Sequence, residues 1–178
     1  KWFQTSKTVV AYNQHERRNR YKHQPGGTAI ISTGEMALRV NSSSHDSRRM
    51  GRWSSQTIQG KQGILTRIVS VYVPILSSTH GLKKVMCQQQ RALLAMNVKG
   101  HVMTIFWKDF WEQVDEWLSN GEQLIIGGDW NRDVTNKQFL ANFENSLLIG
   151  NFYCFYQQTC SYSCHCFYLH YDQHLNRC

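Results

Sequence analysis

The sequence predicts an α/β (or α+β) domain, in which helices are layered on a sheet. Two neighbouring segments carry this prediction. Apolar residues recur at steps of three and four from Thr104, the expected helix cap, to Leu118, and charged residues fill the opposite face. Asn120–Gly121 then predicts the end of the helix, and the apolar run 124–126 has the composition of a buried strand.

The first half of the chain contains the other strand candidates. In order, they are residues 9–12, 28–32, 36–40 and 65–73. We expect a polar loop at 41–47, and a hairpin turn at Gly60–Gly63 that leads into the last strand. That strand alternates best, with Tyr72 on one face and Val71 and Val73 on the other.

Two further helices are predicted, over residues 85–98 and within residues 139–149. The exposed face of the first is expected to carry Gln88, Gln89, Gln90 and Arg91. The tryptophans of the 104–118 helix recur on its apolar side, so we expect them to pack in the core rather than to bind a ligand.

Charge favours a polyanionic partner. Lys and Arg number 20 against 12 Asp and Glu, which gives a net charge of +8, and this excess points to nucleic acid first. Part of it lies in residues 1–25, where an ordinary solvated loop is the alternative. No apolar run approaches the ~20 residues of a membrane span, so no membrane partner is expected. No obligate protein partner can be inferred.

The cysteines divide the chain near residue 150. Only Cys87 precedes this point, so we expect a reduced, intracellular domain over residues 1–150 and a Cys-, Tyr- and His-rich tail over 151–178 outside the fold. An out-of-frame reading would give a similar composition. The metal-ligating residue types of the tail are Cys160, Cys164, Cys166, His170 and His174. Their spacing lacks the paired C-x2-C of structural zinc sites, so we do not expect zinc there.

Polar residues follow directly on the strand at 124–126. Gly127 and Gly128 interrupt the apolar run, and Asp129 and Asn131 come next. Glycine permits close backbone approach, and an acid and an amide two positions apart on an extended segment point to the same side. We expect these side chains to converge on one substrate group at a sheet edge. A plain strand-to-loop turn is the alternative, because Gly, Asp and Asn are common turn residues.

Three features now form an ordered pattern: the strand RIVSVYVP at Arg67–Pro74, two helices, and IIGGDWN at Ile125–Asn131. The pattern resembles the endonuclease/exonuclease/phosphatase family, which has the DNase-I-like fold. Within it, GGTAIIS and the GRW at 51–53 are most similar to the endonuclease domains of LINE-type retrotransposons. The resemblance covers roughly residues 8–150, and implies a two-sheet sandwich flanked by helices and truncated at both ends.

The resemblance implies metal-dependent hydrolysis of DNA phosphodiesters, with Mg²⁺ or Mn²⁺ as the cofactor. Asp129 matches the acid that orients or deprotonates the attacking water. Asn131 matches the amide that holds the scissile phosphate and helps to place the water and the metal, so both residues are the candidate metal ligands. Tyr72 matches the tyrosine whose hydroxyl contacts the phosphate. A retroelement product of this kind would act in the nucleus.

Family motifs near both ends are missing. Strands ending in Asn and in the main metal-binding Glu would precede Lys1, which suggests a fragment, and Ser44-His45-Asp46 differs in order and position from the family's Ser-Asp-His segment. His80 is interpreted as a surface residue. We therefore expect little or no nuclease activity from this chain on supercoiled plasmid with Mg²⁺. The alternatives are a non-catalytic nucleic-acid-binding remnant and a phosphomonoesterase of the same fold.

Overall fold

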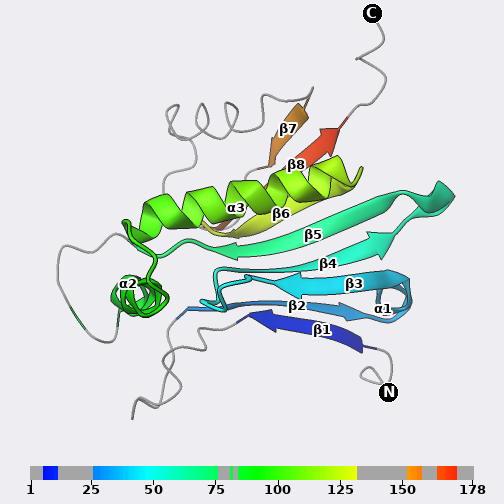
Figure 1. Ribbon diagram of the computed structural model, residues 1–178. Helices are drawn as coiled ribbons and strands as arrows, with labels where there is room; N and C mark the ends of the chain where they lie inside the picture. The colour runs from blue at the N-terminus through cyan, green and yellow to red at the C-terminus, as the bar shows by residue number, and fades with distance from the viewer. Residues whose placement is uncertain are drawn as a thin grey trace, which may run out of the picture.

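A computed structural model describes residues 6–11, 26–75, 81 and 84–131, and the backbone alone of 152–157 and 164–171. Its elements, in order, are β1 (Ser6–Ala11), β2 (Thr28–Thr33), α1 (Glu35–Arg39), β3 (Val40–His45), β4 (Trp53–Gln59), η1 (Lys61–Gly63), β5 (Leu65–Tyr72), α2 (Val85–Ala95), α3 (Val102–Ser119), β6 (Gln123–Asp129), β7 (Phe152–Gln157) and β8 (Cys164–Tyr171). Figure 1 shows helices layered on sheets, so the predicted mixed α/β class is confirmed.

One mixed sheet runs in the order β3-β4-β5-β6-β8-β7, and β1 and β2 form a separate antiparallel pair. The β4–β5 hairpin closes through the 3-10 turn η1, which confirms the turn predicted at Gly60–Gly63. β5 and β6 are parallel, whereas the other neighbours are antiparallel. Because parallel strands need a crossover connection, α2 and α3 lie between them in the chain.

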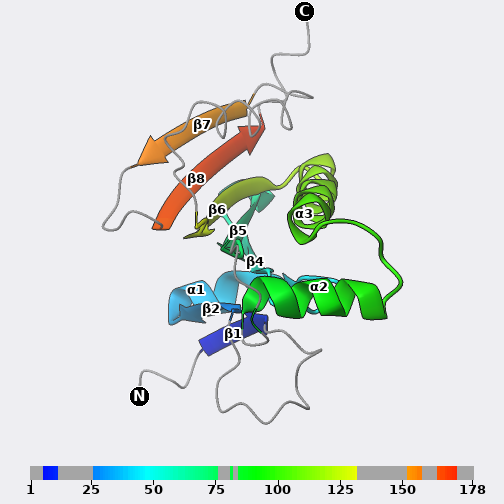
Figure 2. The ribbon, with the colours of Figure 1, turned by 90° about the vertical axis from the view of Figure 1, so that its left-hand side faces the viewer.

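The large sheet is covered on both faces at β4. Figures 1 and 2 show α3 alongside β5 and β6, and Figure 1 shows the β1–β2 pair below β3 and β4. In β4 six of seven consecutive residues are buried, which requires cover on both sides of that strand. On the β1–β2 side, buried Gln56 accepts a hydrogen bond from the Ser32 hydroxyl at 2.6 Å and donates to the carbonyl of Lys7 at 3.1 Å.

The main core lies between α3 and the sheet. Its buried members from α3 are Met103, Phe106, Phe110, Val114, Trp117 and Leu118. They meet the inward-facing valines of β5 and Trp53 of β4, whose ring contacts the rings of Phe106 and Phe110 edge-on. Trp107 and Trp111 are partly buried against the same cluster. The prediction that the tryptophans of this helix belong to the core is confirmed.

Two local predictions in the first half are wrong. Residues 36–40, predicted as a strand, form α1 and the first residue of β3, after Gly34 turns the chain at φ +59°. Residues 41–47, predicted as a loop, contribute most of β3 instead. β3 is an edge strand in which only Val40 is buried. Its exposed positions are polar, so the apolar alternation that marks a strand in the sequence is absent.

Two predictions on the helices also need correction. Thr104 lies inside α3, and the cap is His101, whose Nδ1 accepts the backbone N–H of Met103 at 3.3 Å. On α2, Gln88 and Gln89 are buried rather than exposed, and Gln89 Nε2 donates to the carbonyl of Met50 at 3.2 Å. The predicted stop at Asn120 is confirmed.

Four predictions fall outside the described residues. These are the basic loop that follows the first strand within residues 1–25, the helix within 139–149, the surface position of His80, and the zinc-ligand types of the tail, since no side chain of β7 or β8 is described. The backbone of β8 pairs with β6, and β7 pairs with β8. The division of the chain at residue 150 stays a prediction.

Candidate functional site

The ends of β5 and β6 bring together the three residues that the sequence singles out. Tyr72 lies opposite Asp129 in the parallel register. One residue further on, the N–H of Val73 donates to the carbonyl of Asp129 at 2.9 Å, and Asn131 Nδ2 donates to the carbonyl of Val73 at 2.7 Å. Tyr72, Asp129 and Asn131 therefore lie near one another where β5 and β6 end.

Asp129 and Asn131 also form a local turn. Asp129 Oδ1 accepts the backbone N–H of Asn131 at 3.1 Å, and Asn131 is left-handed at φ +47°, which asparagine tolerates better than most residues. The turn anticipated as the alternative is thus present. Among the described residues, Asp129 Oδ2 and Asn131 Oδ1 accept no hydrogen bond, and both side chains are partly exposed. These two oxygens remain for a ligand.

Tyr72 supplies a hydroxyl beside the carboxylate. Burial raises the pKa of Tyr72 above its ordinary value, and the negative charge of Asp129 raises it further. Both effects disfavour the phenolate, so the hydroxyl keeps its proton at neutral pH and can donate a hydrogen bond. The register of the two strands sets Tyr72 and Asp129 side by side.

Two glycines allow close packing at the site. A Cβ on Gly128, which has φ +150°, would lie 2.0 Å from the carbonyl oxygen of Val71, so the close backbone approach expected at this position is confirmed. Gly26, at φ +81°, lies against the ring of Tyr72 and the side chain of Val85. Sequence reasoning did not connect Gly26 to the site, and the Gly-Gly pair at 26–27 was the available signal.

Trp130 anchors the segment between the two polar residues. Its side chain is fully buried, and its ring lies parallel to that of Trp107 on α3, with 6.3 Å between centroids and 4° between planes. Because Trp130 is fixed in the core, Asp129 and Asn131 on either side of it have little freedom to move away from β5.

Metal binding at the site would use few ligands from the described residues. Among them, no group of three or more His, Cys, Asp or Glu side chains is placed to hold an ion. Asp129 and Asn131 offer one carboxylate and one amide oxygen. Mg²⁺ commonly takes one or two carboxylates and completes its shell with water and substrate phosphate, so this pair fits such an ion without forming a cage.

The triplet Ser44-His45-Asp46 has a structural explanation. Asp46 is fully buried and forms an ion pair with Arg52, and His45 Nδ1 lies 3.3 Å from the carbonyl oxygen of Asp46. The carboxylate of Asp46 is therefore committed to Arg52 and does not polarise His45.

Comparison of the chain with models of known protein families finds no match, and comparison with curated protein sequences finds none. Within the described part of the chain, every helix is too short or too polar to cross a membrane.

The closeness of Tyr72 and Asp129 can be tested by titration. We expect Asp129→Asn to lower the pKa of Tyr72, because it removes the negative charge that opposes ionisation of the phenol. The measurement is the ¹³C NMR shift of tyrosine Cζ against pH, with the Tyr72 signal assigned by Tyr72→Phe. Asp115→Asn is the control, since Asp115 does not contribute to the shift of Tyr72. Equal titration curves for Asp129→Asn and the unsubstituted protein would contradict the arrangement.

Proposed function

We propose that this chain carries the phosphate-binding part of a metal-dependent phosphodiesterase that acts on DNA and has the DNase-I-like fold. The observation that supports it most strongly is the parallel register of β5 and β6, which sets Tyr72 opposite Asp129, with Asn131 joining the two strand ends. These are the three positions that the family resemblance assigns to catalysis, and Tyr72 is distant in the sequence from Asp129 and Asn131.

The chemistry follows from the atoms at the site. Asp129 Oδ2 can accept a proton from a water molecule and orient it toward phosphorus. The protonated Tyr72 hydroxyl and the second N–H of Asn131 Nδ2 can donate to the non-bridging phosphoryl oxygens, where negative charge develops. A Mg²⁺ or Mn²⁺ ion held by Asp129 and Asn131 oxygens would supply further neutralisation of that charge.

DNA is the proposed substrate because the chain is strongly basic and the retrotransposon endonucleases are its nearest resemblance. Its net charge of +8 equally supports the alternative, a nucleic-acid-binding protein without catalysis. Binding of that kind depends only on phosphate contacts. It would weaken by about 0.9 log units per log unit of salt for each phosphate neutralised, and it would not require Asp129.

The test is localised binding of Mn²⁺, which broadens the NMR signals of nearby nuclei. We expect Mn²⁺, added to the ¹⁵N-labelled chain with a short DNA duplex, to broaden the amides of Tyr72 and Asp129–Asn131 first. Asp129→Asn should abolish this selective broadening, because it removes the one carboxylate that the described residues place at the site. Asp115→Asn, which neutralises a carboxylate on α3, should leave it intact.

Three outcomes would decide against the proposal. Broadening spread over acidic residues elsewhere would show that the metal does not bind at this site. DNA binding that is unchanged by Mn²⁺ and by Asp129→Asn would favour the non-catalytic alternative. Preference for a 5′-mononucleotide over the duplex at the same site would instead indicate a phosphomonoesterase. Catalysis is followed separately as nicking of supercoiled plasmid, where we expect little product.

A further inference from the structure

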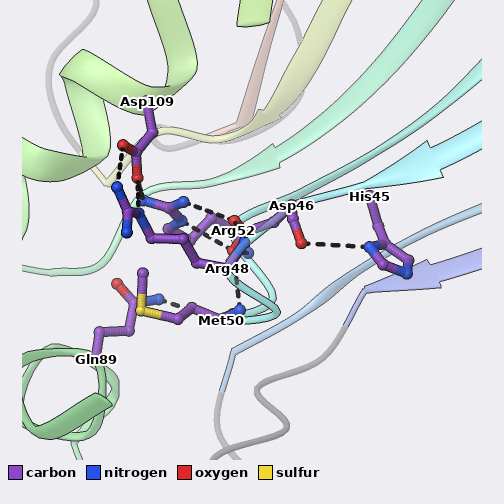
Figure 3. Close-up of polar contacts among 7 residues, drawn as sticks. All are labelled: His45, Asp46, Arg48, Met50, Arg52, Gln89 and Asp109. Carbon is purple, nitrogen blue, oxygen red and sulfur yellow. Dashed lines mark hydrogen bonds and ion pairs between the residues drawn. The ribbon is translucent and has the colours of Figure 1, made fainter. Parts of the chain in front are cut away.

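A buried ion cluster lies where the β3–β4 loop meets α3. Figure 3 shows Arg52 between two carboxylates: its Nε and Nη2 donate to Asp46 at 2.9 and 2.6 Å, and its Nη1 donates to Asp109 of α3 at 2.8 Å. The side chains of Arg52 and Asp46 are 1% and 0% exposed. Burial by itself raises the pKa of Asp109, but its bonds to Arg48 and Arg52 outweigh burial and lower it, so the carboxylate stays ionised.

The cluster fixes the backbone of the loop as well as its side chains. The carboxylate of Asp46 accepts the N–H groups of Arg48 and Met50 at 3.0 and 2.9 Å. The guanidinium of Arg52 also lies over the ring of Trp53, 4.5 Å from its centroid. Arg52 is therefore held from three sides, by its own loop, by α3 and by the first residue of β4.

The carbonyl of Arg52 connects this cluster to the candidate site. It accepts the N–H of Tyr72 at 2.8 Å, and the next N–H along the chain, that of Val73, donates to Asp129 on the opposite side. The backbone at Tyr72 is thus bound to the ion cluster on one side and to the candidate site on the other. A displacement of Arg52 would be passed directly to Tyr72.

We propose that Arg52 is a positioning residue, which fixes the main chain of Tyr72 and so keeps its hydroxyl beside Asp129. This rests on the proposed function, in which Tyr72 contacts the phosphate. A buried ion pair contributes little net stability, because desolvation offsets the attraction between the charges. Its use here is geometric, since a fork-shaped guanidinium bound to two carboxylates has one position.

The experiment replaces the guanidinium and follows Tyr72 itself. Arg52→Met leaves Asp46 with its two backbone donors and Asp109 with Arg48, so no buried carboxylate loses every partner. We expect hydrogen exchange of the Tyr72 amide to accelerate at least about tenfold relative to that of Ile68, in the middle of β5. Arg52→Lys should not restore slow exchange in full, because an ammonium cannot bridge both carboxylates.

The matched control breaks a second buried ion pair among the described residues. Arg67, near the opposite end of β5, donates to Glu122 at 2.8 Å, and both side chains are buried. Glu122→Gln should lower the stability of the fold without selectively accelerating exchange of the Tyr72 amide. A Tyr72 amide that exchanges no faster in Arg52→Met, or accelerates only as much as Ile68, would overturn the proposal.

If Arg52→Met does not fold, Asp109→Asn serves instead, because it weakens the hold of α3 on Arg52 and leaves Asp46 in place. We then expect a smaller but still selective acceleration of exchange at Tyr72. An equal acceleration at Tyr72 and Ile68 would overturn the proposal. These measurements need neither metal nor DNA. Failure of the Mn²⁺ test with selective exchange at Tyr72 would refute the proposed function alone, and the reverse result would refute the positioning role alone.

Discussion

Gly128→Ala is expected to destabilise the fold by at least about 4 kcal/mol, a loss that few single substitutions cause. The added Cβ would lie 2.0 Å from the carbonyl oxygen and 2.7 Å from the nitrogen of Val71, and both are backbone atoms of the neighbouring strand. A side chain could rotate away, but β5 cannot move without breaking its pairing with β4. The positive φ of Gly128 adds a further backbone cost for alanine.

The measurement is urea unfolding followed by tryptophan fluorescence. Gly34→Ala is the matched control, because Gly34 has φ +59° but no atom within 4 Å of the added Cβ. It should cost only about 1–3 kcal/mol, because φ +59° with ψ −134° is a backbone conformation that L-residues rarely adopt. Similar losses for the two variants would show that β5 and β6 do not approach as closely as described.

The strands that form the site were predictable, because their signals are local. The alternation of β5 and the apolar run of β6 each follow from residues within one strand, and the close approach at Gly128 follows from its missing side chain. The pairing of β5 with β6 was not predictable from local pattern. It brings Tyr72 next to Asp129 across a crossover of two helices, and only the family resemblance suggested that these residues meet.

The link between the ion cluster and α3 could not be predicted because its partners are distant in sequence. Helical spacing places Asp109 on the solvent face with the other charged residues, but its partner Arg52 lies 57 residues away. A charged residue is normally exposed unless it is paired, and the pair is visible only in three dimensions. The same reason explains Gln89, whose polar group is satisfied by the distant backbone of Met50.

Asp46→Ala is the second substitution for which we expect a large effect, a loss of about 3–5 kcal/mol. It removes both hydrogen bonds between Asp46 and the Arg52 guanidinium, and it leaves the N–H groups of Arg48 and Met50 without their acceptor. Arg52 would then be a buried cation with only Asp109 as a partner. Leaving a buried charge without its counterion costs more than the ion pair contributes when intact.

This reasoning also predicts the double variant. Asp46→Ala combined with Arg52→Met should lose less stability than the sum of the two single substitutions, because the second removes the charge that the first leaves unpaired. Urea unfolding of the four proteins gives the coupling energy directly. Exact additivity would mean that Arg52 finds water or another partner once Asp46 is gone. In that case Asp46 would not be what holds Arg52 in place, and the positioning role would rest on Asp109 alone.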